Sequence, residues 1–191
     1  LFPLADQVSF FNLFKYLTFR TGGAIMTALI VAFVAGPGLI RWLRSKQKHG
    51  QPIRLDGPES HLLTKKGTPT MGGVLILLAL TVATLLWADL TNGFVWVALL
   101  VTGGYGMIGF ADDFLKVTKT NPKGLNGRAK LAGQVIIGGA AALVIYRLTA
   151  PELDSSLAVP FFKNVLLDLG LFYLPVAVFV MVGASNAVNL T

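Results

Sequence analysis

Two adjacent carboxylates, Asp112 and Asp113, stand at the end of a long apolar run, in the string FADDFLK. Neighbouring carboxylates repel each other, so a pair beside lipid needs a cation, a metal ion or a shared proton. Lys116 lies four residues after Asp112, on the same helix face, and can supply an ordinary salt bridge. The alternative is a general base or a site for phosphate and metal, because carboxylates are the oxygen ligands that Mg²⁺ prefers.

A second cluster, KKGTPTMGG at residues 65–73, precedes another apolar run. Thr70 is predicted to cap a helix N-terminus, whose free N–H groups and positive dipole end would lie beside Lys65 and Lys66. This arrangement favours an anion such as phosphate. The alternative is a capped helix start whose lysines only set the membrane topology, since the string is not a P-loop.

A third cluster, KVTKTNPKGLNGRAK at residues 116–130, carries five cations and no anion. Its turn signals are Asn121-Pro122 and Asn126-Gly127. A nucleotide diphosphate or a lipid phosphate would be attracted to such a loop, with Lys123 among its cations. The alternative is that the cations only orient the chain in a membrane.

A fourth cluster, SNAVNLT, places Asn186 and Asn189 three residues apart on one helix face. Two such amides can bridge helices or bind a polar ligand.

A G-x-G-x-x-G string at 104–109 is not read as a dinucleotide site, because it lies inside an apolar run and follows no strand. Its small residues predict close helix packing instead.

The elements that position these clusters are five uncharged apolar runs, at 22–40, 71–88, 94–111, 131–146 and 169–188. The chain is 54% hydrophobic and 13% charged, which excludes an ordinary soluble domain. About 20 residues of helix cross a bilayer core, and the runs lack the alternation of barrel strands. We therefore predict an all-α, polytopic integral membrane protein: a single transmembrane domain over 1–191 with five transmembrane helices. Pro175 and the Gly36-Pro37-Gly38 step are expected to kink two of them.

Twelve of the sixteen Lys and Arg residues fall in the loops 41–70 and 112–130, so these loops are predicted to be cytoplasmic and the N-terminus outside. The start LFPLADQVSF predicts no cleaved signal peptide. Residues 10–17 form either a helix lying in the outer interface or an extension of the first helix. The net charge of +7 sits between apolar runs, which is not the pattern of a nucleic-acid-binding face. With no cysteine, thiolate chemistry and disulfides are excluded.

Five strings, in order, carry a resemblance: DGPESH, KKGTPTMGG, GFADDFLKV, KGLNGRAKLAGQ and NAVNLT. Together they resemble the bacterial phospho-N-acetylmuramoyl-pentapeptide transferases, a branch of the polyprenyl-phosphate N-acetylhexosamine-1-phosphate transferase superfamily. The wider superfamily shares the Asp-Asp step and the Asn-rich helix end, whereas GTPTMGG is similar to the muramoyl-pentapeptide branch.

The resemblance implies a Mg²⁺-dependent transfer of phospho-MurNAc-pentapeptide from its UDP carrier to undecaprenyl phosphate, at the cytoplasmic face of the bacterial plasma membrane. The products would be lipid I, a peptidoglycan precursor, and UMP. By motif, Asp112 would be the base or the nucleophile, with Asp113 beside it. The substrate-binding residues implied by the motifs are Lys65 or Lys66, Thr70, Lys116, Lys123, Asn186 and Asn189.

The resemblance also implies a longer protein of about ten helices, of which this chain is the N-terminal half. Family members continue past the position of Thr191 with an Asp-rich string, and the main Mg²⁺ ligand is expected there. Residues 1–191 alone are therefore expected to be inactive. The implied partners are UDP-MurNAc-pentapeptide, undecaprenyl phosphate and membrane lipids, with no nucleic acid, and a homodimer stays open. The alternatives are another polyprenyl-phosphate sugar-1-phosphate transferase, a non-catalytic lipid-binding or transport module, and a structural helix bundle.

Overall fold

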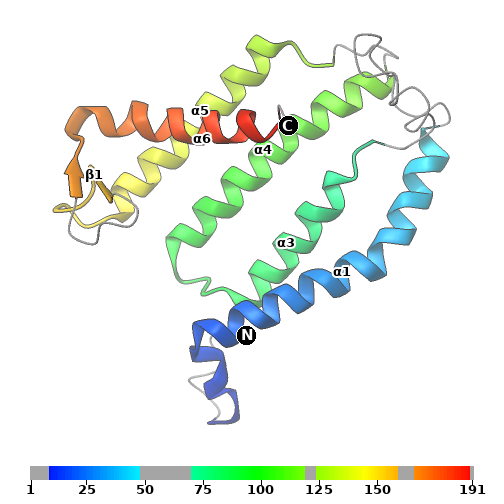
Figure 1. Ribbon diagram of the computed structural model, residues 1–191, viewed down its shortest axis with the longest axis horizontal. Helices are drawn as coiled ribbons and strands as arrows, with labels where there is room; N and C mark the ends of the chain where they lie inside the picture. Colours follow the sequence, from blue (N-terminus) through cyan, green and yellow to red (C-terminus); the bar gives the residue numbers. More distant parts are fainter. Residues whose placement is uncertain (1–8, 48–69, 119–123, 159–165, 190–191) are drawn as a thin grey trace. The chain divides into compact units, whose positions relative to one another are not determined.

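The computed structural model describes residues 9–47, 70–118, 124–158 and 166–189, which are mostly helical (Figure 1). The all-α class is therefore confirmed. The elements in chain order are η2 (Ser9–Lys15), α1 (Leu17–Lys46), α3 (Gly73–Trp87), α4 (Gly93–Thr118), α5 (Gly127–Leu148), β1 (Ser156–Ala158), β2 (Leu166–Asp168), η3 (Gly170–Phe172) and α6 (Tyr173–Asn189).

Four helical stretches in the described residues are long and apolar enough to cross a membrane: α1, α4, α5 and Gly170–Ala187. The remaining predicted run, 71–88, forms α3, which is apolar but only 15 residues long. At a rise of about 1.5 Å per residue, α3 is shorter than a bilayer core of about 30 Å. Large apolar side chains such as Phe33 and Phe179 are 77% exposed, as expected for helices whose surroundings are lipid.

The helix ends differ from the predicted runs where charged residues flank an apolar stretch. The third run was predicted to end at 111, but α4 continues through both aspartates to Thr118. Likewise α5 begins at Gly127, four residues before the predicted run, because a helix can extend past the lipid into a polar surrounding.

The expected kink at Pro175 is wrong, since this residue lies in the first turn of α6, where its missing N–H breaks no helical bond. Pro37 lies inside α1, which bends toward its C-terminal end (Figure 1).

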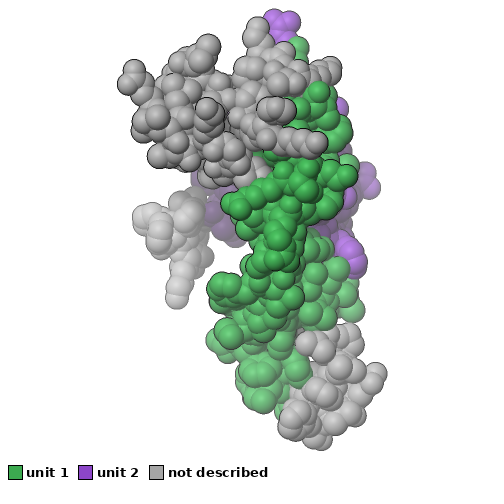
Figure 2. Space-filling view, turned by 90° about the vertical axis from the view of Figure 1, so that its right-hand side faces the viewer, with its two compact units in different colours: residues 1–91, 106–126 green, residues 92–105, 127–191 purple. Residues whose placement is uncertain are grey.

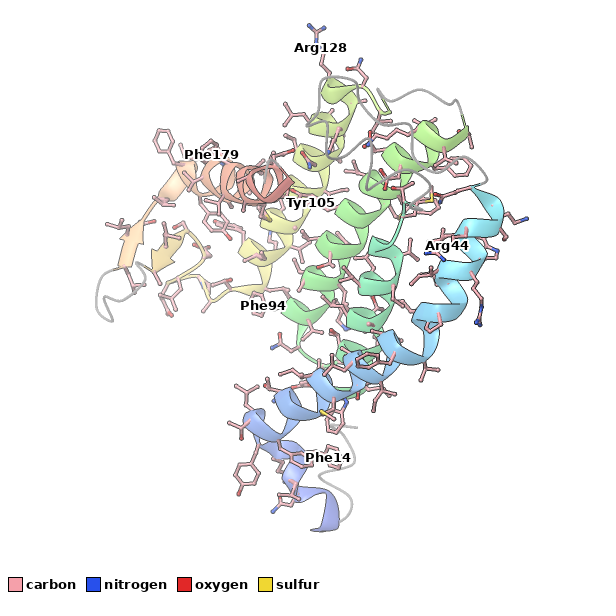
Figure 3. The ribbon with its side chains drawn as sticks, turned by 45° about the vertical axis from the view of Figure 1, so that its right-hand side comes forward. Phe14, Arg44, Phe94, Tyr105, Arg128 and Phe179 are labelled. Carbon is pink, nitrogen blue, oxygen red and sulfur yellow. The ribbon has the colours of Figure 1, made fainter. Side chains whose placement is uncertain are left out.

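The chain divides into two compact units (Figure 2). Unit 1 contains residues 1–91 and 106–126, and in it α1 packs along α3. Trp87 of α3 donates a hydrogen bond from Nε1 to Thr27 Oγ1 at 2.8 Å, and a Cβ on Gly23 would overlap its ring. The ring of Phe14, a residue of η2 that Figure 3 labels, lies 5.4 Å from that of Trp87. Because η2 is a separate 3-10 helix that ends at Lys15, the structure contradicts the alternative in which these residues extend the first helix.

Unit 2 contains residues 92–105 and 127–191, and in it α5 packs against α6. A Cβ on Gly104 of α4 would lie 2.9 Å from Ile137 Cδ1 of α5, while in unit 1 a Cβ on Gly106 would overlap Leu77. These glycines therefore serve close helix contact, as the 104–109 string predicts. Between α5 and α6, strands β1 and β2 form an antiparallel hairpin in which Leu157 pairs with Leu167. Sequence reasoning missed this hairpin because three-residue strands carry too little alternation to detect.

Candidate active site

The two aspartates and Lys116 lie on the last turns of α4 and form one charge cluster. Lys116 Nζ is 2.6 Å from Asp112 Oδ2 and 3.4 Å from Asp113 Oδ1. The Asp112 and Lys116 side chains are only 16% and 15% exposed, so water screens this pair less than it would screen a surface pair. The salt bridge predicted from the spacing is therefore present, and one cation compensates both carboxylates.

The second oxygen of Asp112 is bound by backbone from the segment after α4. The Leu125 N–H donates to Asp112 Oδ1 at 2.7 Å. Gly124 precedes it with φ +60°, a conformation that glycine adopts at little cost. A Cβ at this position would overlap Asp112 Oδ1 and lie 2.7 Å from Lys116 Cε. This close approach requires glycine, so the Gly124-Leu125 step holds one oxygen of the Asp112 carboxylate while Lys116 holds the other.

Thr70, which precedes α3, bonds to the charge cluster, and Gln47, which follows α1, bonds to Thr70. Thr70 Oγ1 donates to Asp113 Oδ2 at 2.7 Å. The Gln47 side chain, 8% exposed, pairs with the Thr70 backbone, accepting from its N–H at 2.9 Å and donating to its carbonyl at 3.2 Å. The end of α1, the start of α3 and the end of α4 therefore meet at one site, as expected if loops 41–70 and 112–130 share a membrane side.

The prediction that Thr70 caps the following helix is wrong. The cap position of α3 is Gly72, and no side chain hydrogen-bonds there. Met71 has φ +72°, an uncommon conformation for a residue with a side chain, and it separates Thr70 from the helix. The Thr70 hydroxyl consequently faces Asp113 rather than the first turn of α3.

Asn186 belongs to a polar network between α5 and α6 in unit 2. Its Nδ2 donates to Gln134 Oε1 at 2.8 Å and to the Val182 carbonyl at 2.9 Å. The amide therefore bridges two helices, which was one of the two predicted alternatives. Asn189 lies one turn further along α6, and its side chain is outside the described residues.

Other predicted residues are not described. Lys65, Lys66 and Lys123 lie outside the described residues. Besides Lys116, the described cations of the third cluster are Arg128, which Figure 3 labels, and Lys130, both on the first turn of α5. The structure thus brings together Thr70, Asp112, Asp113 and Lys116 in unit 1.

Three contributors were missed by sequence reasoning: Gln47, the Gly124-Leu125 step and Gln134. A lone glutamine carries no spacing signal. For Gly124, the only sequence signal was that it follows the Asn121-Pro122 turn.

The oxygen-rich chemistry of the aspartate pair fits a divalent cation in part. Carboxylates are suitable Mg²⁺ ligands, and Mg²⁺ commonly uses one or two of them together with substrate phosphates and water. Within the described ranges no group of three or more acidic, histidine or cysteine side chains could hold a metal. The pair could therefore supply some ligands, with substrate oxygens or further residues supplying the rest.

Comparisons with known proteins agree with these motifs. Residues 65–77, which include Thr70, match a signature described as phospho-N-acetylmuramoyl-pentapeptide-transferase signature 1. A protein of that name from Granulibacter bethesdensis is 62% identical over 189 residues, covering 99% of this chain and 52% of the relative. Another, from Maricaulis maris, is 52% identical and is covered to 53%. This chain thus spans about half the length of these relatives.

The family model described as glycosyl transferase family 4 matches residues 95–191, a range that contains the aspartate pair, Lys116 and Asn186. These residues lie in a membrane protein with an aspartate and lysine cluster at the end of a spanning helix. Because the match extends over half of the sequence, the chain belongs to glycosyl transferase family 4.

Proposed function

We propose that this chain is part of an enzyme that transfers phospho-MurNAc-pentapeptide from UDP-MurNAc-pentapeptide to undecaprenyl phosphate, forming lipid I and releasing UMP. The curated relatives named for this transferase support the proposal, and it concerns the protein that contains these residues. The observation that carries it is the convergence of Thr70, Asp112, Asp113 and Lys116 at one end of unit 1. The other polyprenyl-phosphate transferases are less favoured, because the signature at 65–77 is described for the muramoyl-pentapeptide enzymes.

The chemistry required is a phosphoryl transfer. An oxygen of the lipid phosphate forms a bond to the phosphorus that carries the sugar, and the bond from that phosphorus to the bridging oxygen breaks. The bridging oxygen and its electron pair leave with UMP. Catalysis of such a step is largely positioning and stabilisation of charge on the phosphate oxygens.

Asp112 would act at the attacking side, either as a base for the lipid phosphate or as a nucleophile toward the same phosphorus. Both of its oxygens accept hydrogen bonds, from Lys116 and from Leu125. Either role therefore requires Asp112 to exchange one of these contacts for substrate. Of these two partners Lys116 binds through its side chain and Leu125 through its backbone, and a lysine that leaves a carboxylate for a phosphate oxygen would stabilise the developing charge. Asp113, held by Thr70, would keep its position through the exchange.

A Mg²⁺ ion is part of the proposal. Asp113 and Asp112 are the described residues that would hold it, together with phosphate oxygens and water. When bound, the ion would neutralise charge on the diphosphate and its leaving group.

We also propose that the protein lies in the bacterial inner membrane with the aspartate cluster facing the cytoplasm and the N-terminus outside. The support is the concentration of Lys and Arg in loops 41–70 and 112–130. Because the chain has no cysteine, single cysteines can report the topology directly. In intact cells an impermeant thiol reagent should label Thr91→Cys but neither Ser45→Cys nor Asn121→Cys. Labelling of Ser45→Cys or Asn121→Cys would contradict the orientation.

The test of the activity is Asp112→Asn in the intact protein, with UMP release measured from UDP-MurNAc-pentapeptide and undecaprenyl phosphate. Loss of general-base chemistry alone costs about 10²–10⁴-fold, so at least a hundredfold loss of turnover is expected. Asp89→Asn is the matched control, because Asp89 is a carboxylate between α3 and α4 that bonds to Thr91. Turnover by Asp112→Asn equal to that of the control would refute the proposed role of the cluster.

A further inference from the structure

The side-chain amides of Asn186 and Gln134 form a chain of hydrogen bonds whose direction is set by one backbone carbonyl. A carbonyl can only accept, so the Asn186 atom 2.9 Å from the Val182 oxygen must be Nδ2. That Nδ2 also lies 2.8 Å from Gln134, whose nearer atom must then be Oε1. Gln134 Nε2 in turn faces Ser185 Oγ at 3.3 Å, and Ser185 gives its own proton to Val182 at 3.2 Å. Each step is the only assignment that satisfies the next one.

The consequence is that both amide hydrogens of Asn186 are committed inside the protein. Its Oδ1 has no hydrogen-bond partner in the part of the chain that the structure describes. Gln134 is 5% exposed, whereas Asn186 is half-buried. The buried amide thus orients the more accessible one, and the group left for a ligand is a hydrogen-bond acceptor.

Gln134 is itself held from α4. The Tyr105 hydroxyl donates to the Gln134 backbone carbonyl at 3.1 Å, and Tyr105 projects from the part of α4 that belongs to unit 2 (Figure 3). Gly138, one turn after Gln134, leaves room for this hydroxyl, because a Cβ there would lie 3.1 Å from its oxygen. Gln134 therefore contacts α4 through its backbone carbonyl and α6 through its side-chain amide.

We propose that Gln134 is a positioning residue for the nucleotide-sugar substrate: it holds the Asn186 amide so that Oδ1 accepts a hydrogen bond from an N–H or O–H of that substrate. The inference rests on the proposed function and on the substrate contact that the family motifs imply for Asn186. The base and ribose of a uridine nucleotide carry such donors. A site that presents a fixed acceptor discriminates against analogues that lack the donor, because the acceptor is then left unpaired.

The experiment compares Gln134→Met with Gln134→Glu in the intact protein. Methionine matches the length of glutamine but offers no good acceptor, so the Asn186 amide is free to turn. Glutamate keeps an oxygen for Asn186 Nδ2. We expect Gln134→Met to raise the KM for UDP-MurNAc-pentapeptide about tenfold, the effect of one hydrogen bond, while kcat changes less. Gln134→Glu should stay within about threefold of wild type and so retain most of that affinity.

Asn186→Ala and the double variant Asn186→Ala with Gln134→Met complete the cycle. If Gln134 acts through Asn186, the methionine adds no further rise in KM once Asn186 is gone. Independent, multiplying effects of the two substitutions would overturn the inference, as would a Gln134→Glu variant as impaired as Gln134→Met. An unchanged KM in Asn186→Ala would also overturn it.

Calorimetric titration of UDP into the same proteins separates this inference from the proposed function. The Kd for UDP should follow the same pattern as KM, and it does not depend on turnover. A wild-type protein that releases no UMP but shows this Kd pattern would refute the proposed function and retain the role of Gln134. Release of UMP with additive Kd effects would do the reverse.

Discussion

Replacing Gly124 with alanine should loosen the backbone contact to Asp112. Gly124 has φ +60°, and an added Cβ would overlap Asp112 Oδ1 and approach Lys116 Cε. The carboxylate cannot move aside freely, because Lys116 and the Leu125 N–H hold its two oxygens. The residue that must move is therefore position 124, and it carries the Leu125 N–H with it.

The magnitude follows from three terms. An L-residue in the left-handed region costs about 1–2 kcal/mol, and a hydrogen bond to a charged group contributes about 1.5–3 kcal/mol. Alanine also restricts the unfolded chain, which offsets about 0.4–1 kcal/mol. The net loss is about 2–4 kcal/mol. It corresponds to roughly 30- to 1000-fold in the equilibrium between the state in which the Leu125 N–H binds Asp112 and the state in which this bond is open.

The assay is amide hydrogen exchange at Leu125, measured by NMR on the purified protein in detergent micelles. Gly124→Ala should speed this exchange by at least about thirtyfold if local opening controls it. Gly127→Ala is the control, because a Cβ there meets nothing within 4 Å. Equal exchange at Leu125 in the two variants would refute the close-approach argument, since the same substitution would then be harmless at both positions.

Three further predictions concern Thr70, Lys116 and Asp168. Thr70→Val, which removes the hydroxyl bound to Asp113, should lower the free energy of unfolding by about 1–3 kcal/mol in SDS titration. Thr118→Val, which loses only bonds to carbonyls of its own helix, should change it by less than about 0.5 kcal/mol, and equal losses would contradict the role of Thr70. Lys116→Gln in the intact enzyme should raise the KM for the UDP substrate even at about 1 M salt, where diffuse attraction is screened, whereas any effect of Arg44→Gln should vanish there. Two hydrogen bonds hold the pKa of Asp168 below its ordinary value, first that from the Ser155 hydroxyl and then that from the Gly170 N–H. The ionised carboxylate therefore stabilises the hairpin above about pH 3.9, and this contribution is lost as the pH falls through the folded pKa. A ¹³C NMR titration should show the Asp168 pKa rising in Ser155→Ala, and an unchanged pKa would contradict this cause.

The membrane architecture could be predicted from the sequence because it depends on local composition. Each apolar run must become a helix in lipid, since no water satisfies its backbone, and the helices appear where the runs were placed. The pairing of Asp112 with Lys116 was equally accessible, because a spacing of four residues puts two side chains on one helix face. The clusters were found for the same reason, since charged and amide side chains stand out beside uncharged runs.

The tertiary structure decided which distant groups meet. Gln47 and Thr70 are joined across 23 positions, and Gln134 and Asn186 across 52. Glutamine and asparagine amides can each donate or accept, so their partners follow from helix packing and not from residue type. The same holds for Thr70: its sequence context favoured a helix cap, whereas the left-handed Met71 placed the helix start two residues later and left the hydroxyl to Asp113. Composition alone thus determined that the chain crosses a membrane and where its charges gather. Packing decided which atoms the charged and amide groups contact, because those contacts join segments with no local pattern in common.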